Sequence, residues 1–243
     1  AWRSTLAISR LCTLMDCGFT IPVVTETKIS KAEWDKVVEK FTLRSPKELD
    51  WSKDEAGEEV LMGALQEQVT GAGIPMEKSA AWRKLIDQPE ARVEESLKGL
   101  KDDGASIAAE FSRKDSMEAA KALSSILVLD YLTNNFARVE AAGPHGFGTI
   151  AKEGKVFSLD NIEMFQTRAS TRVKGRFKWA TRYSKTTIES LRNLKPEEIN
   201  VLLFPEPTRA EKTAVKVFWK QHAALLKRVD ELLARGDESK VFF

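Results

Sequence analysis

The sequence predicts a helix-rich α+β protein, with a few short strands embedded in a mainly helical chain. Apolar residues recur at helical spacing over most of its length, and only a few short stretches are bounded by turns as strands are. At 243 residues, 42% hydrophobic and 30% charged, the chain is long enough for one large domain or two small lobes. We therefore expect the hydrophobic core of an ordinary globular protein, with small sheets attached to it.

The first part of the chain alternates helices with strands. Gly18 ends the first helical pattern, Pro22 marks an edge or a break in the strand that follows, and Ser30 is a suitable N-cap for the next helix. We expect helices over 2–17 and 30–41, and strands over 19–25 and 60–69.

The remainder is mostly helical, with one short hairpin around the turn at Glu153-Gly154. The strongest helix is capped by Asp115 or Ser116, and prolines at 205 and 207 separate the last two helices. We expect short helices between 77 and 114, a helix over 115–133, strands over 149–151 and 155–159, and helices over 186–194, 196–203 and 208–234.

Composition gives no indication of a nucleic-acid-binding, membrane-spanning or disulfide-rich protein. A net charge of +2 is too mild to indicate nucleic-acid binding by itself, and no apolar run reaches the roughly 18–20 residues that a membrane span needs. Cys12 and Cys17 form neither a disulfide framework nor a metal-ligand pattern, so we expect reduced thiols. The chain opens without methionine, which favours a processed or trimmed N-terminus and leaves organellar and cytoplasmic locations open.

Two segments carry the strongest functional signal. Residues 127–138 read Leu-Val-Leu-Asp-Tyr-Leu-Thr-Asn-Asn-Phe-Ala-Arg, and residues 155–165 read Lys-Val-Phe-Ser-Leu-Asp-Asn-Ile-Glu-Met-Phe. Together they resemble the D-x-L-x-x-N-x-D-R and I-D-N-x-x-x-F motifs of the atypical kinases. That group includes actin-fragmin kinase, the phosphoinositide 3- and 4-kinase-like proteins and kinases of the secretory pathway. The likeness follows the family order over roughly residues 2–235.

The resemblance implies a catalytic role for several residues. Asn135 and Arg138 would belong to the catalytic loop, position 137 would hold the catalytic base, and Asp160 would bind magnesium. If so, Asn135, Arg138 and Asp160 lie close together in the fold. As a bare pattern, Asp160-Asn161 is only a turn after a strand.

The resemblance also implies a nucleotide-binding hinge over residues 63–72. The adenine would contact this segment at Glu67, Gln68 and Val69. Without the resemblance, the same stretch is a buried strand leading into a turn.

The departures from the kinase pattern all affect catalysis. The base position holds Ala137, which can neither accept a proton nor bond a hydroxyl. A second magnesium-binding Asn is usual shortly after the loop, and residues 139–150 contain none. The phosphate-holding glycine loop and lysine, expected before the helix over 2–17, are not found elsewhere.

We therefore expect a kinase-like C-terminal lobe over 77–243 and a remnant of the N-terminal lobe and hinge over 1–76. The first hypothesis is a catalytically silent pseudokinase that serves as a binding or scaffolding subunit with protein partners and needs no cofactor. One alternative is an active ATP- and magnesium-dependent protein or lipid kinase, truncated at its N-terminus and mutated at 137. The other is a helical accessory subunit of a larger complex.

One further segment, 168–185, is strongly basic and contains no acidic residue. In a kinase-like layout the activation segment lies here. Basic residues interleaved with aromatics can bind an acidic or phosphate-bearing partner. The alternative is a solvated surface that the aromatics anchor to the helical lobe. The basic residues are Arg168, Arg172, Lys174, Arg176, Lys178, Arg182 and Lys185, and the aromatics are Phe177, Trp179 and Tyr183.

Overall fold

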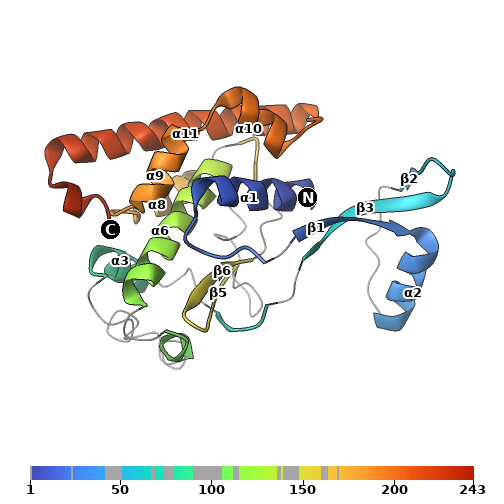
Figure 1. Cartoon of the computed structure of the whole chain (residues 1–243), viewed down its shortest axis with the longest axis horizontal. Helices are drawn as coiled ribbons and strands as arrows, with labels where there is room; N and C mark the ends of the chain where they lie inside the picture. The colour runs from blue at the N-terminus through green and yellow to red at the C-terminus, as the bar shows by residue number, and fades with distance from the viewer. Residues whose placement is uncertain are drawn as a thin grey trace.

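The chain folds into a helical body from which one arm of strands projects (Figure 1). The architecture is helix-rich α+β, as the sequence predicts. The computed structural model describes residues 2–22, 24–41, 51–66, 69–73, 79–89, 106–111, 115–135, 138, 148–159, 164–168 and 170–243.

The arm is an antiparallel sheet in the order β1-β3-β2. Thr27 of β1 lies opposite Gly63 of β3, and β2 pairs with β3 near the far end of the arm. Ser30 caps the helix there, because its hydroxyl accepts from the Glu33 amide while the Glu33 carboxylate accepts from the Ser30 amide. The elements of the arm are β1 (Val24–Ser30), α2 (Lys31–Phe41), β2 (Ser52–Lys53) and β3 (Glu59–Gln66).

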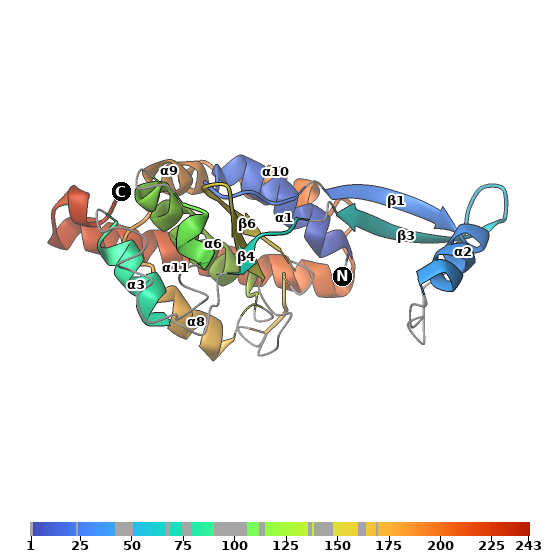
Figure 2. The same ribbon diagram turned by 90° about the horizontal axis from the view of Figure 1, so that it is seen from below.

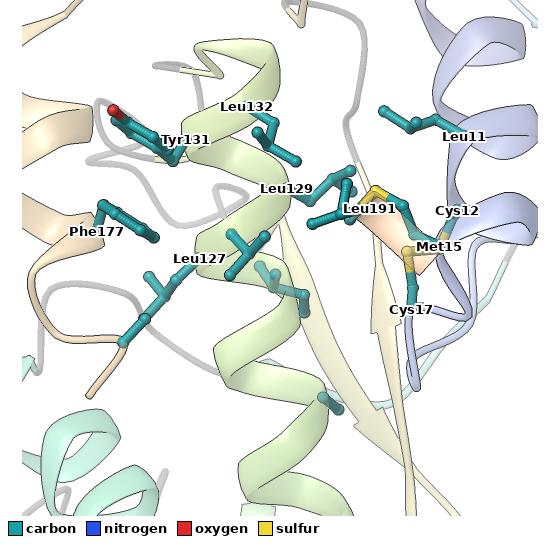
Figure 3. Close-up of a cluster of buried hydrophobic side chains, with 14 of the residues drawn as sticks. Leu11, Cys12, Met15, Cys17, Leu127, Leu129, Tyr131, Leu132, Phe177 and Leu191 are labelled. Carbon is teal, nitrogen blue, oxygen red and sulfur yellow. A yellow bond between two sulfur atoms is a disulfide. The ribbon is translucent and has the colours of Figure 1, made fainter. Parts of the chain in front are cut away.

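The centre of the body is α6 (Ser116–Thr133), which is apolar on nearly all sides. Fifteen of its residues are buried, because helices and strand β6 pack against it. Figure 3 shows Tyr131 beside Phe177 on one side of α6, and Leu11 and Met15 of the first helix on the other. The elements in contact with α6 include α3 (Ser79–Asp87), α8 (Thr171–Phe177) and α11 (Arg209–Arg235).

A second group of helices packs outside this core. Here α1 (Trp2–Met15) contacts α9 (Lys185–Arg192) and α10 (Pro196–Leu203). The long α11 begins at a capping box between Thr208 and Glu211, and η2 (Glu238–Lys240) follows it. Within the described ranges, no helix is both long and apolar enough to cross a membrane.

A second small sheet joins the end of the arm to the body, in the order β4-β5-β6. Ala72 of β4 pairs with Ala151 of β5. The approach is so close that a Cβ on Gly71 would lie 2.3 Å from the carbonyl oxygen of Ala151, so only glycine fits there. The strands are β4 (Ala72–Gly73), β5 (Thr149–Lys152) and β6 (Lys155–Ser158).

Several predicted element boundaries differ from the structure. The predicted strand over 19–25 is wrong, because Thr20 pairs only with Phe157 of β6 and β1 begins at Val24, after Pro22. The strand predicted over 60–69 runs from Glu59 to Gln66. Helix α8 is not among the elements that the sequence pattern predicts. Asp115 is the N-cap of α6 but its side chain makes no capping hydrogen bond.

The expectation of reduced thiols at Cys12 and Cys17 is also wrong. Helix α1 ends at Met15, and Asp16 and Gly18 then adopt positive φ values of 48° and 67°. The chain turns back, so the two Cα atoms lie 5.2 Å apart and the sulfur atoms are joined in a disulfide. A continuous helix would have separated the two side chains. The pair lines a cavity of about 590 Å³ between α1 and the start of α6.

Candidate functional site

The catalytic-loop-like segment forms a buried cluster of polar side chains at the end of α6. The Nε of Arg138 donates to both carboxylate oxygens of Asp130, at 2.8 and 3.1 Å. The side-chain amide of Asn135 donates to the same carboxylate at 2.9 Å. All three residues are at most 5% exposed. Two predicted site residues, Asn135 and Arg138, therefore meet on one carboxylate.

The rest of the Arg138 guanidinium binds the β5–β6 hairpin. One terminal nitrogen donates to the Gly148 carbonyl and to the Thr149 hydroxyl, and the other donates to the Ser158 hydroxyl at 2.7 Å. A Cβ on Gly148 would lie 2.9 Å from the guanidinium, so a larger residue there would force the Arg138 side chain to shift. Arg138 thus ties the catalytic-loop-like segment to the strand that leads toward Asp160.

The local fold that creates this cluster depends on Asn134. It ends α6 in the left-handed conformation, with φ of 53°, which asparagine tolerates better than most residues. This turn allows the backbone N–H of Asn135 to donate to the backbone carbonyl of Asp130 at 2.8 Å. The Asn134 side chain accepts from the Ser170 amide and donates to the Arg168 carbonyl, which joins α6 to the start of α8.

The two segments that carry the kinase resemblance contact each other at two residues of the second segment. Ser158 contacts Arg138, and the Phe165 amide donates to the Thr133 carbonyl at 2.6 Å. The Phe165 ring packs edge-on against Phe204, with ring centroids 5.2 Å apart. Position 160 falls between two residues that both contact the first motif. Asp160 itself lies outside the described residues.

The electrostatics of the cluster are dominated by burial. Burial raises the pKa of the Asp130 carboxyl, while the nearby Arg138 guanidinium and the hydrogen bonds from Arg138 and Asn135 oppose that rise. Both Asp130 oxygens accept hydrogen bonds from Arg138. This carboxylate is therefore not available to accept a proton from a substrate hydroxyl.

The remaining predicted site residues are only partly described. Ala137, Glu67 and Gln68 lie outside the described residues, as Asp160 does. Val69 is half-buried in the connection from β3 to β4. Among the residues that the structure describes, no group of three or more His, Cys, Asp or Glu side chains is placed to hold a metal ion.

The basic segment over 168–185 divides into structural and exposed residues. Phe177 stacks on Tyr131 with ring centroids 4.1 Å apart, and Tyr183 is buried, so these two aromatics anchor the segment to the helical body. Arg176 lies over the Trp179 ring at 5.5 Å, and Lys185 pairs with Glu238. Arg182 lies over the Phe243 ring and donates to the Phe242 carbonyl. Five basic residues have exposed side chains: Arg168, Arg172, Lys174, Lys178 and Lys185.

Sequence reasoning did not single out three residues of the cluster. Thr149 and Ser158 bind Arg138 through hydroxyls on a strand face, and no local pattern marks them. Asn134 could have been predicted as the end of the helix, because asparagine after a helical pattern often adopts the left-handed conformation.

No protein-family model matches this chain, and no curated protein matches its sequence. Function is therefore inferred from the residues and their geometry alone.

Proposed function

We propose that the chain is a catalytically silent, kinase-like domain that acts as a binding or scaffolding subunit. The observation that carries this proposal is the buried cluster around Arg138. Its donors all face protein acceptors: a carboxylate, a carbonyl and two hydroxyls. The polar residues that remain of the catalytic-loop motif hold the fold together, and the base position is an alanine.

Phosphoryl transfer to a hydroxyl benefits from a carboxylate beside the nucleophile. Ala137 supplies none, and Asp130 in the same segment is committed to Arg138 and Asn135. The close fit of the two motifs supports a kinase-like ancestry, since Ser158 and Phe165 both contact the first motif. A domain that keeps this packing while lacking the base is suited to binding.

The surface best suited to a partner is the exposed side of α8. Lys174 and Lys178 lie about one helical turn apart, and a Cβ built on Gly175 between them would meet no atom within 4 Å. Since 168–185 contains no acidic residue, the local field favours an acidic or phosphate-bearing protein partner.

The catalytic part of the proposal is tested with Mg-ATP. We expect no thermal stabilisation of the chain by millimolar Mg-ATP, whereas a Kd tenfold below the ligand concentration would stabilise it by about 1.4 kcal/mol. We also expect Ala137→Asp to transfer no radiolabelled phosphate from ATP. Phosphate transfer by that variant would favour the alternative of a kinase mutated at position 137.

The binding part is tested with a fluorescent acidic peptide and its phosphoserine counterpart. Lys174→Glu with Lys178→Glu should weaken binding of the preferred peptide by about tenfold or more, because both changes reverse charge on α8. Lys212→Glu with Lys216→Glu, exposed on α11, is the matched control. Equal losses in both pairs would indicate nonspecific charge attraction and argue against an α8 site.

A further inference from the structure

Within the part of the arm that the structure describes, β1 is an edge strand of the sheet. In the sheet order β1-β3-β2, β1 has a strand partner on one side only among the described residues. Figure 2 shows β1 and β3 side by side along the arm. Backbone N–H and C=O groups of alternate β1 residues therefore point away from β3 and can pair with another strand.

The arm also buries few of its own side chains. Among its described residues Val60 is buried, while Ile29, Leu61 and Met62 are only half-buried. A ribbon of two long strands with so little core is marginally stable in water, and addition of strands strengthens it. Its unpaired edge is therefore a natural place for association.

We propose that β1 pairs antiparallel with β1 of a second copy of this chain, about a two-fold axis at Thr27. The two three-stranded arms then form one continuous six-stranded sheet. The contact is isologous, because each copy contributes the same seven residues, Val24–Ser30. This inference stands independently of the proposed function.

The side chains of β1 are self-complementary in this register. On one face, the exposed Glu26 lies opposite Lys28 of the second copy, and Lys28 lies opposite the second copy's Glu26. On the other face, Thr25 lies opposite Ile29 and Thr27 lies opposite Thr27. All of these are β-branched residues, which pair well across strands.

Neighbouring registers are unfavourable. A two-fold axis at Glu26 would place glutamate opposite glutamate, and one at Lys28 would place lysine opposite lysine. Parallel pairing in register would create both repulsions at once. Lys28 is held 2.6 Å from Asp54 within its own arm, and its side chain is still 48% exposed. It can therefore bridge Asp54 and the Glu26 of the second copy.

The contact is small, because one strand edge of seven residues contributes it. We therefore expect a weak dimer that forms over a micromolar range, below the size of obligate interfaces. Sedimentation of the full chain over increasing protein concentration should show reversible conversion of monomer to dimer. A chain that stays monomeric at hundreds of micromolar would overturn the proposal.

Charge reversal tests the register. Glu26→Lys alone places two lysines opposite each other, and Lys28→Glu alone places two glutamates opposite each other, so each variant should dimerise at least about tenfold more weakly. An equimolar mixture of the two single variants should form a heterodimer. In that mixture, positions 26 and 28 are both lysine in the first variant and both glutamate in the second, so every facing pair has opposite charges. The double variant, with both charges exchanged, should dimerise as the original chain does.

Two further measurements keep the result interpretable. Lys53→Glu, on exposed β2, should leave dimerisation unchanged and controls for general charge effects. Thermal unfolding of the body should be similar for all variants, because Glu26 and Lys28 are exposed on the arm. Lys28→Glu also loses its pair with Asp54, so Glu26→Lys, which keeps that pair, is the cleaner single variant. If the variants dimerise normally one by one, or if the mixture fails to associate, the β1 edge is not the interface.

Discussion

Two ion pairs of similar length, one in the body and one on the arm, have different consequences. In the body, the Arg138 Nε lies 2.8 Å from Asp130, and the side chains are 2% and 6% exposed. On the arm, the Lys31 Nζ lies 3.1 Å from Glu59, and the side chains are 53% and 50% exposed. On the arm, water solvates the separated charges almost as well as the ion pair does, so the pair contributes little. In the body, a separated charge would be buried without water, so breaking the pair is costly. The distance between two charges therefore does not predict what the pair contributes to stability.

The largest expected effect comes from breaking the buried pair. Asp130→Ala leaves Arg138 as an uncompensated buried charge and should lower the free energy of unfolding by about 3–5 kcal/mol. Glu59→Ala on the arm should change it by less than about 1 kcal/mol. Both are measured by chemical denaturation followed by circular dichroism. Equal losses would mean that solvent reaches the Arg138 cluster, against the burial described above.

A smaller effect separates the arm from the body. Val60→Ala removes two methyl groups from the one fully buried side chain described on the arm, which should cost about 1–2 kcal/mol locally. Hydrogen exchange should become faster in β1 and β3 and stay unchanged in α6, because the arm contributes little to the body's core. Exchange that accelerates equally in α6 would show that the arm and the body unfold as one unit.

The smallest effect concerns His222 on α11, whose ring Nε2 lies 2.8 Å from the Leu191 carbonyl. Burial lowers the pKa of His222 below its ordinary value of 6.5, and the Leu191 contact partly opposes that shift. The unfolded chain then binds a proton that the folded chain does not. Neutral His222 therefore contributes to the free energy of unfolding in full above pH 6.5, and this contribution is lost as the pH falls through the folded pKa.

We therefore expect the free energy of unfolding to fall between about pH 7.5 and about pH 5.5 partly through His222. His222→Gln keeps a donor for the Leu191 carbonyl and should flatten the pH dependence over that interval. The matched comparison is the same pH series on the original chain. An unchanged slope in the variant would assign the pH dependence to other groups.

The sequence by itself determined the fold class and many of the helices. Apolar spacing located α6 to within one residue and predicted the bounds of α10, because a helix buries a periodic face that its own residues define. Asn135 and Arg138 meet on the Asp130 carboxylate, while the predicted closeness of Asp160 to them stays a prediction, since Asp160 lies outside the described residues.

Only the tertiary structure decided what these residues do in the fold. Arg138 donates hydrogen bonds to Gly148, Thr149 and Ser158, which are ten to twenty residues away in the chain. Asn134 accepts a hydrogen bond from Ser170. Cys12 and Cys17 are joined because the helix ends at Met15 and the backbone turns at Asp16, between the two cysteines. Such partners depend on turns and packing between distant segments, which local hydrophobic periodicity does not encode. For the same reason, the position of β1 at the edge of the described sheet follows only from the strand order β1-β3-β2.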